Sequence, residues 1–446
     1  MSSGMPCRPL PEHLSISPTW VSSGLRPQVV QIAEEEMPLS LIFVGIDWSE
    51  GHHDLCVEDE SGKVLARRRI GNDPEGLTQL QATLAGRVGE PEQVVVGIEA
   101  NQGPMLQALR ASGYTIYALN PLAASRYRER HSASRAKSDR GDAKLLAEIV
   151  RTDRHNHRRL PEDSQQAEAI QVLARAHKNA IWTRQQLANQ LRSALVEFYP
   201  GALAAFGEDL DAAETLAILK LAWTPVLGRQ LLLAKIHSTL RRAGRQRYLE
   251  TRTQTIQAAL RAPQLEQPAK IAQAYGQSVL ALVQVLQALN LQVAALEAEL
   301  AASFKVHPDA EIYLSQPGLG NVLGARALGE FGDDPNRFIN GKARRNYAST
   351  SPITKASGNK KVVLARFVHN DRLADVCHQW AFAALTGSTG ARRYYDVKRE
   401  RQKDHEQALR AVGNRLVGIL DGCLRHRQLY SEAIAWPNTI EQETAA

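Results

Sequence analysis

The sequence lacks any uninterrupted apolar run near the ~20 residues that a helix needs to cross a bilayer, so we do not expect an integral membrane protein. Its first residues, MSSGMPCRPLPEH, lack the apolar core of a signal peptide, which predicts a cytoplasmic protein. Cysteine is scarce, and no two of the four residues (Cys7, Cys56, Cys377 and Cys423) form a CxxC pair. Neither a zinc ribbon nor a disulfide framework is therefore supported.

Repeats and nucleotide-binding motifs are also absent. The sequence shows no self-similarity at a period of about 20–50 residues, no long low-complexity tract and no P-loop. Its 446 residues suffice for about three domains, and its 43% hydrophobic and 23% charged residues are ordinary for a globular protein. With 54 Lys and Arg against 47 Asp and Glu, the net charge of +7 admits nucleic acid as a partner without establishing one.

The front of the chain predicts an α/β domain over residues 41–160. Residues 1–40 are rich in Ser, Pro and Glu and lack periodicity, which indicates a flexible extension. Apolar or alternating runs then predict strands at 41–48, 53–59, 63–70, 93–98 and 114–119. Helices are predicted at 74–87, at 103–112, from about 121 and from about 140. Three hairpin-connected strands before a strand–helix–strand section indicate a mixed sheet flanked by helices.

The rest of the chain predicts helices. Nine positions from Ile170 to Phe198 step by three and four and are mostly apolar, and seven positions from Val279 to Leu300 repeat the spacing. These heptad seams indicate either helices buried in a bundle or a coiled coil within or between chains. We expect a helical or coiled-coil domain over residues 161–305, with 200–275 unassigned in detail. A mainly helical domain over 306–436 and a tail over 437–446 follow.

Four acidic residues are placed where they could converge. Asp47 ends the first predicted strand, Glu99 follows the strand at 93–98, and Asp139 and Asp142 are three apart on a predicted helix. Carboxylates that converge without basic partners repel each other, and Mg²⁺ or Mn²⁺, which prefers oxygen ligands, removes that cost. Two such ions can activate a nucleophile and stabilise the leaving oxygen in phosphoryl transfer. Alternatively, the acids only end strands and favour a helix dipole.

A basic stretch near the end of the chain surrounds a serine. Between residues 342 and 366 there are seven basic residues and no acid: Lys342, Arg344, Arg345, Lys355, Lys360, Lys361 and Arg366. This density predicts phosphate contacts and salt-sensitive binding. Ser357 precedes Gly358, which lets a loop present the hydroxyl, but no histidine base stands beside it, so its activation calls for a metal held elsewhere. Alternatively, Ser357 belongs to an ordinary turn in a nucleic-acid-binding loop.

Two further motifs admit nucleic-acid contacts. Residues Pro317–Gly320 resemble the turn of a helix-hairpin-helix, whose glycines let backbone N–H groups approach a phosphate. A simple loop turn accounts for the same residues equally well. Arg392 and Arg393 stand beside Tyr394 and Tyr395, which could stack on bases or lie in a helical core.

Taken together, these motifs resemble the DEDD transposases of the insertion-sequence one-ten family, the bridge-RNA-guided serine recombinases. The likeness runs from about Leu41 to Trp436. The segments GIDWS, GIEA and KSDRGDA resemble the family's RuvC-like, ribonuclease-H-like domain. The segments QPGLGNVLGARALGEFGD, SPITKASGNKKVVLARFVHNDRL, ARRYYD and ALRAVGNRLVGIL resemble its C-terminal transposase domain. The chain departs from the family before Pro352, where the family often has glycine and this chain has residues Ala348–Ser351.

The resemblance implies roles for these residues. Asp47, Glu99, Asp139 and Asp142 would hold Mg²⁺, and Ser357 would attack a DNA phosphate to form a phosphoserine link that a second attack resolves. The implied partners are donor and target DNA, a structured bridge RNA that pairs with both, and further copies of the chain in a dimer or tetramer. In that assembly the metal domain of one subunit meets the serine domain of another. A hydrolytic RuvC-like nuclease acting on branched DNA and a non-catalytic nucleic-acid scaffold are the competing readings.

Overall fold

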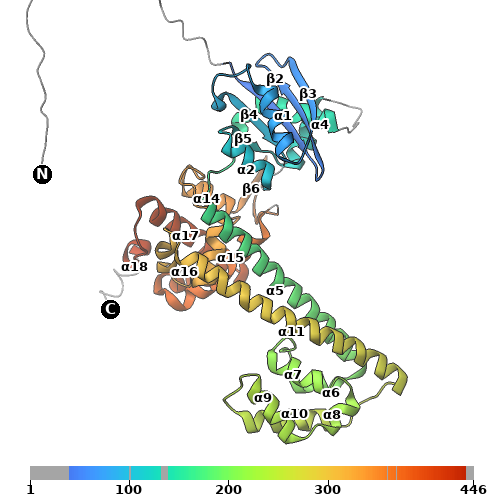
Figure 1. The fold of residues 1–446 in the computed structure, drawn as a ribbon. Helices are drawn as coiled ribbons and strands as arrows, with labels where there is room; N and C mark the ends of the chain where they lie inside the picture. The colour runs from blue at the N-terminus through green and yellow to red at the C-terminus, as the bar shows by residue number, and fades with distance from the viewer. Residues whose placement is uncertain (1–39, 100–101, 132–138, 359, 368, 438–446) are drawn as a thin grey trace, which may run out of the picture. The chain divides into compact units, whose positions relative to one another are not determined.

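The computed structural model describes residues 40–99, 102–131, 139–358, 360–367 and 369–437 (Figure 1). The flexible extension predicted for 1–40 and the tail at 437–446 lie outside these ranges except for residues 40 and 437. The chain divides into two compact units, one ending at Leu160 and the other starting at Pro161. The three cysteines within the described ranges are free.

The first unit is built on a mixed five-stranded sheet. Its strand order is β3-β2-β1-β4-β5; β2 pairs antiparallel with both β1 and β3, whereas β4 pairs parallel with both β1 and β5. This confirms the mixed sheet that the sequence predicts. The strands are β1 (Ile42–Trp48), β2 (His52–Glu58), β3 (Val64–Gly71), β4 (Val94–Ile98) and β5 (Thr115–Ala118). The helices are α1 (Pro74–Leu84), α2 (Pro104–Ala111), α3 (Pro121–His131) and α4 (Asp139–Thr152).

Helices cover both faces of this sheet. Side chains alternate across a strand, so β1 turns Val44 and Ile46 to one face and Phe43 to the other. The face with Val44 and Ile46 shares a buried cluster with side chains of α1 and α2. The face with Phe43 shares a second cluster with side chains of α3 and α4. The sheet therefore has a core on each side, and α4 lies across β1, β2 and β4 on the second side.

The second unit contains two long helices that pack against each other, α5 (Gln165–Phe198) and α11 (Ala269–Lys305). They run antiparallel, because the Phe198 ring stacks on Tyr275 at 5.5 Å while the Arg184 guanidinium donates to Asn290 at 3.3 Å. Both heptad seams thus lie in long helices that face each other within one chain (Figure 1). This packing agrees with the intrachain form of the predicted pairing.

Each end of this helix pair belongs to a separate core. At one end, Leu191, Leu195 and Leu286 are buried with the short helices that follow α5. At the other end, Ile170 and Phe304 are buried with the C-terminal helices. The short helices are α6 (Pro200–Phe206), α7 (Ala213–Leu221), α8 (Pro225–Gln230), α9 (Leu233–Arg242) and α10 (Leu249–Arg261).

The C-terminal part is mainly helical, as predicted, and also carries one hairpin. Trp380 is fully buried at its centre. Its helices are α12 (Ala310–Ser315), α13 (Asn321–Phe331), α14 (Gly341–Tyr347), α15 (Asp371–Gly387), α16 (Thr389–Glu400), α17 (His405–His426) and α18 (Glu432–Ala435). The hairpin pairs β6 (Ile353–Ser357) with β7 (Lys360–Leu364).

By length and composition alone, α11 is the one helix in the described ranges that could cross a membrane. The sequence contains no uninterrupted apolar run of that length because glutamines and an asparagine interrupt α11. Mostly buried core helices of globular proteins meet the same criterion. Helix α11 buries Val279, Val283 and Leu286 in this unit, although only 22% of its most apolar window is buried. Its packing along α5 favours the core-helix reading.

Candidate functional site

Two glycines let α4 approach the sheet closely. Gly45 of β1 and Gly97 of β4 are register partners, and both face α4. A Cβ atom on Gly45 would lie 1.8 Å from the Ala143 carbonyl oxygen, and one on Gly97 would lie 2.6 Å from the Leu146 carbonyl oxygen. No side chain fits in either place, so these glycines fix where the helix backbone rests.

This contact brings the N-terminus of α4 to one edge of the sheet. Asp47 lies two residues after Gly45, and Glu99 two residues after Gly97, so both belong to the face that α4 covers. Asp139 and Asp142 occupy the first turn of α4. Burial and the charges of the neighbouring carboxylates Asp142, Asp139, Glu99 and Asp54 raise the pKa of Asp47 to about 6. The four acids identified in the sequence therefore lie near one another at this edge, although among the described residues the group within metal-ligand distance is His52, Asp54 and Asp139.

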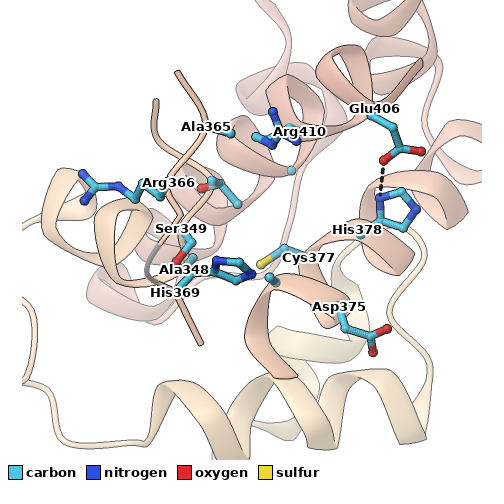
Figure 2. A pocket seen from close by; sticks show the side chains of 13 residues that line it. Ala348, Ser349, Ala365, Arg366, His369, Asp375, Cys377, His378, Glu406 and Arg410 are labelled. Carbon is cyan, nitrogen blue, oxygen red and sulfur yellow. Dashed lines mark ion pairs between the residues drawn. The ribbon is translucent and has the colours of Figure 1, made fainter. Parts of the chain in front are cut away.

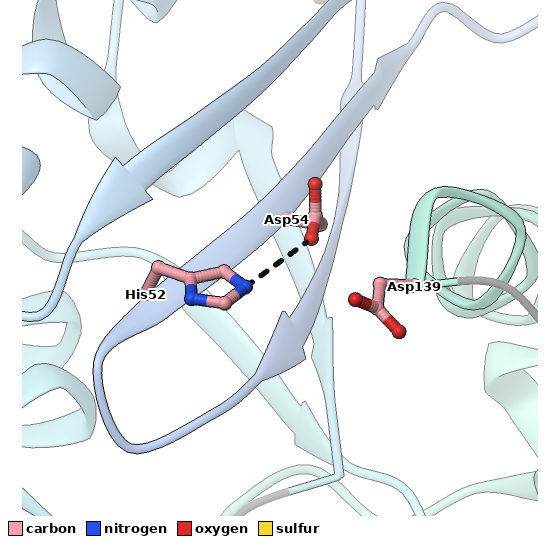
Figure 3. Close-up of side chains that lie close together, drawn as sticks. All are labelled: His52, Asp54 and Asp139. Carbon is pink, nitrogen blue, oxygen red and sulfur yellow. Dashed lines mark ion pairs between the residues drawn. The ribbon is translucent and has the colours of Figure 1, made fainter.

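A fifth carboxylate, which the sequence analysis did not predict, lies at the same edge of the sheet. Asp54 of β2 is the register partner of Asp47 and is buried. One oxygen each from Asp54 and Asp139 and one ring nitrogen of His52 lie within 4.8 Å of one another (Figure 3). The signal was present in the sequence, since a tight turn at residues 49–51 places Asp54 opposite Asp47.

Two arginines also contact these acids. Arg69 of β3 is the register partner of Asp54; its guanidinium lies 2.6 Å from an Asp54 oxygen and 3.4 Å from an Asp139 oxygen. Arg128 of α3 lies 2.5 Å from an Asp142 oxygen. These contacts depend on strand register and helix packing, which the spacing of the four acids does not reveal.

The residues present fit a divalent cation. Carboxylate oxygens are the ligands that Mg²⁺ and Mn²⁺ prefer. The two guanidinium groups contact Asp54, Asp139 and Asp142, whereas the pKa of Asp47 is raised by burial and by its acidic neighbours. A cation between Asp47, Glu99, Asp139 and Asp142 would relieve this repulsion.

Ser357 lies at the tip of the hairpin rather than in an irregular loop. It ends β6, pairs with Lys360 across the turn and precedes Gly358, whose φ of +53° is in the left-handed region. The Ser357 side chain is exposed, as are all the residues of β7. Its hydroxyl is thus accessible, and three lysines (Lys355, Lys360 and Lys361) are exposed on the same hairpin.

The other predicted basic contacts divide into exposed and structural groups. Arg392 and Arg393 are exposed on α16, and Arg392 also pairs with Asp396 one turn later at 3.0 Å. Arg345 is half-buried. Arg366 is half-buried too, and its guanidinium donates to the Ser351 carbonyl and to Asn346 at 3.1 Å each, so it secures the base of the hairpin.

Arg344 corrects the prediction of a phosphate contact. Its side chain is buried, its Nε donates to Asp421 at 2.8 Å, and its guanidinium lies over the Phe338 ring at 4.6 Å. This buried arginine links α14 to Asp421 of α17, and its guanidinium is not accessible to a phosphate. Helix α14 buries Arg344 but leaves Arg345 half-exposed. A count of basic residues in the sequence cannot distinguish the two.

The other two motifs also serve the core. Gly318 adopts a φ of +82° in the turn between α12 and α13, and a Cβ there would lie 2.7 Å from the Ala384 amide nitrogen. Trp380 donates to the Pro317 carbonyl at 2.9 Å, which seats the turn on α15. Tyr394 packs on Trp436 with ring centres 5.6 Å apart. The turn and this tyrosine therefore have packing roles that the sequence left open.

A cavity of about 320 Å³ lies near the base of the hairpin (Figure 2). Its wall includes Ser349, Arg366, His378 and Arg410, and His378 pairs with Glu406 at 3.4 Å. Ser349 has a φ of +61°, which glycine adopts without strain. This segment lies directly before Pro352, where the resemblance leads us to expect a glycine.

Comparisons with known proteins match two parts of the chain to transposase families. A family model for DEDD transposases of IS110 type, described as "Transposase", matches residues 44–200, and one described as "Transposase IS116/IS110/IS902 family" matches residues 310–396. The chain is 44% identical over 404 residues to a Streptomyces coelicolor mini-circle protein named as a candidate transposase for IS117; the alignment covers 90% of this chain and 98% of that protein. It is 26% identical over 406 residues to an uncharacterized 42 kDa protein of insertion element IS900 from Mycobacterium paratuberculosis, covering 88% and 98% of the two chains.

Proposed function

The chain belongs to the IS110 family of insertion-sequence transposases, and from this premise we propose that it cuts and rejoins DNA through a covalent link to Ser357. Asp47, Glu99, Asp139 and Asp142 form the metal site of this proposal. The observation that carries it is the gathering of carboxylates around Asp47, whose pKa is raised to about 6 by burial first and by these neighbouring charges second. The strand order β3-β2-β1-β4-β5 with antiparallel β3, β2 and β1 supports a ribonuclease-H-like, RuvC-like assignment for this unit.

The proposed chemistry is an exchange of phosphoesters. The Ser357 Oγ attacks a DNA phosphorus atom, an Oγ–P bond forms, and the bond from phosphorus to the leaving strand oxygen breaks. The serine proton is lost and the leaving oxygen gains one. A hydroxyl of a new strand then attacks the phosphoserine, which restores the serine and forms the new phosphodiester, so no ATP is consumed.

The residues around the two centres have separate roles. The acids would hold Mg²⁺ or Mn²⁺, which when bound supplies Lewis-acid stabilisation of the charge that develops at phosphorus. Exposed Lys355, Lys360 and Lys361 would hold the flanking phosphates. Arg345, Arg366, Arg392 and Arg393 remain proposed contacts to the nucleic acid, whereas Arg344 does not.

The remaining parts of the proposal concern organisation. We propose donor and target DNA as substrates, a structured bridge RNA as guide, the cytoplasm as location, and a dimer or tetramer assembled through helical segments. Large apolar side chains exposed on α5 and α11, such as Val172 and Leu291, support self-association. The proposed domains are an extension (1–40), a metal domain (41–160), a helical domain (161–305), a serine domain (306–436) and a tail (437–446).

The test is a trapping experiment with the full-length protein. Labelled donor DNA, target DNA and guide RNA are incubated with Mg²⁺, and protein–DNA adducts are resolved under denaturing conditions. Ser357→Ala is expected to abolish the adduct while DNA binding persists. Thr354→Ala, which removes another exposed hydroxyl from the same hairpin, is the matched control and is expected to keep the adduct.

Two outcomes would replace the proposal. If Ser357→Ala cuts DNA at the normal rate and no adduct forms with the natural chain, water is the nucleophile and the hydrolytic nuclease is the better reading. If Glu99→Gln and Asp142→Asn both leave cutting unchanged, the acidic edge is not the metal site. Cutting without added RNA, at the same site and rate, would remove the guide from the proposal.

A further inference from the structure

The helical segment between α5 and α11 carries an excess of positive charge that neither proposed centre uses. From Lys220 to Arg261 the chain has nine Lys and Arg residues and a single acid, Glu250. This segment forms the end of α7, then α8, α9 and α10. The inference therefore goes beyond the function proposed for Ser357 and the acidic edge.

Part of this charge is neutralised within the fold. Arg245 donates to Glu214 at 2.5 and 2.8 Å, and Arg252 lies 3.7 Å from the same carboxylate. Arg229 pairs with Glu266. The only acid of the segment, Glu250, lies 3.7 Å from a ring nitrogen of His237. Glu214, Glu250 and Glu266 therefore contact Arg245, Arg252, His237 or Arg229, and not the other described basic residues of the segment.

Six of the nine cations form no ion pair with the residues that the structure describes. Lys220 lies on α7, Arg261 donates to the Arg229 and Leu231 carbonyls, and the other four lie on α9 or in the turn after it. Lys235, Arg241, Arg242 and Arg247 are all exposed, and among the residues that the structure describes none of them forms an ion pair. Lys235 and Arg242 are seven residues apart on α9, which is about two helical turns. The Arg242 guanidinium donates a hydrogen bond to the backbone carbonyl of Ser238 at 3.2 Å. Lys235, Arg241 and Arg242 therefore lie on the exposed part of α9, away from buried Ile236 and Leu240, and Arg247 follows in the turn after the helix.

An exposed aromatic side chain directly follows Arg247 in the chain. Tyr248 is 80% exposed and adopts a φ of +54° at the end of the turn that follows α9. A bulky residue in the left-handed region is strained, and this one gains no burial in return. We call Lys235, Arg241, Arg242, Arg247 and Tyr248 the α9 basic surface.

Helix electrostatics explain only part of this surface. Arg241 and Arg242 lie in the last turn of α9, where positive charge favours the helix dipole. Lys235 is in the first turn, where the same dipole disfavours a cation, and Arg247 lies beyond the helix. A polyanionic partner accounts for all four cations together.

We propose that the α9 basic surface binds a nucleic-acid strand with unpaired bases. The four cations contact successive phosphates, and the Tyr248 ring stacks on an unpaired base. Stacking is what selects an unpaired strand, because a continuous duplex keeps its base faces covered. RNA and single-stranded DNA share this chemistry, and the binding assay separates them.

The first experiment measures salt-dependent binding of the full-length protein to a fluorescein-labelled 20-nucleotide single-stranded RNA. Arg241→Ala/Arg247→Ala is compared with Lys270→Ala/Lys305→Ala, which removes the same charge from two exposed lysines of α11. Each lost phosphate contact lowers the slope of log K against log salt by ~0.7, so a fall of about 1.4 is expected for the first pair. Equal slopes and affinities for the two double variants, with both folded by circular dichroism, would overturn the proposal.

The second experiment tests stacking. Tyr248→Ala is expected to weaken RNA binding about fivefold or more, whereas Tyr248→Phe keeps the ring and the affinity. A photoreactive 4-thiouridine RNA is expected to crosslink to the peptide containing Tyr248. Single-stranded DNA and duplex DNA of the same sequence are the other arms: tighter binding of RNA than of single-stranded DNA assigns the strand to RNA, and the reverse to DNA. Equal or tighter binding of duplex DNA, unaffected by Tyr248→Ala, contradicts recognition of an unpaired strand.

Discussion

Asp47 is the last but one residue of a strand that lies between two others in a five-stranded sheet, whereas Ser357 ends a strand of a two-stranded hairpin whose residues are almost all exposed. The acids are held by backbone packing at Gly45 and Gly97, where no side chain fits. A two-stranded hairpin is marginal by itself in water, so the position of Ser357 depends on what binds to it. The proposed metal ligands are thus placed by backbone packing, whereas the proposed nucleophile lies on an exposed hairpin with little packing of its own.

The largest expected effect is at the glycines under α4. Gly45→Ala places a Cβ 1.8 Å from a backbone oxygen, so α4 must leave the sheet. We expect a loss of about 3 kcal/mol or more in unfolding free energy. Chemical denaturation measures this, with Gly51→Ala, where a Cβ meets nothing within 4 Å, as the control. Equal stability of the two variants would mean that the helix does not rest on Gly45.

Glu58 offers a second test of the α4 face, through pH. Burial, with Glu148 as a further cause, raises the pKa of Glu58 from 4.5 to about 7. A raised carboxyl pKa means that the folded state holds a proton longer than the unfolded state, so stability falls as pH rises from about 4.5 to 7. Glu58→Gln removes this penalty and should stabilise the protein by about 2 kcal/mol at pH 8 but not at pH 4.5. The exposed Glu92→Gln should give no pH-dependent gain.

Substituting Asp47 distinguishes the effect of charge repulsion on stability from the effect of cation binding. Asp47→Asn removes one charge from the cluster and should raise stability in chelator by about 1 kcal/mol at pH 8. The same variant should lose most of the thermal stabilisation that Mg²⁺ or Mn²⁺ gives the natural chain. Thermal unfolding with and without each ion measures both effects. A variant that is stabilised by the ions as much as the natural chain would remove Asp47 from the ligand set.

The smallest expected effect on stability comes from substituting Ser349, at the base of the serine hairpin. Ser349 holds a φ of +61°, so Ser349→Gly should relieve local strain and raise stability by about 0.5 kcal/mol after glycine's greater freedom when unfolded is allowed for. Ser349→Ala keeps the strain and should give no gain. If glycine destabilises instead, the positive φ of Ser349 stores no strain that glycine would relieve.

Much of the fold could be predicted because local patterns determine it. The strand at 94–98 is an unbroken apolar run, and Pro104 and Pro121 mark the starts of α2 and α3. Helix α1 ends at Leu84, before the predicted Arg87, because Gly86 takes a φ of +74° and stops it. The helices at 200–261 were not predicted in detail, since they are short and their apolar residues face several neighbours.

The candidate site divides in the same way. Asp47, Glu99, Asp139, Asp142 and Ser357 were identified from residue type, spacing and resemblance alone. Asp54, Arg69 and Arg128 join the acidic edge only through strand register and helix packing. Arg344 and Arg345 are adjacent and chemically identical in sequence, yet only the packing of α14 on α17 decides that Arg344 is enclosed.

The amino-acid order by itself determined which segments become strands and helices and which side chains could carry charge or attack phosphorus, because those properties depend on neighbours a few positions away. Tertiary structure alone decided which charges meet, since a carboxylate on β2, a guanidinium on β3 and another on α3 come within bonding distance only when the sheet has formed and the helices have packed on it.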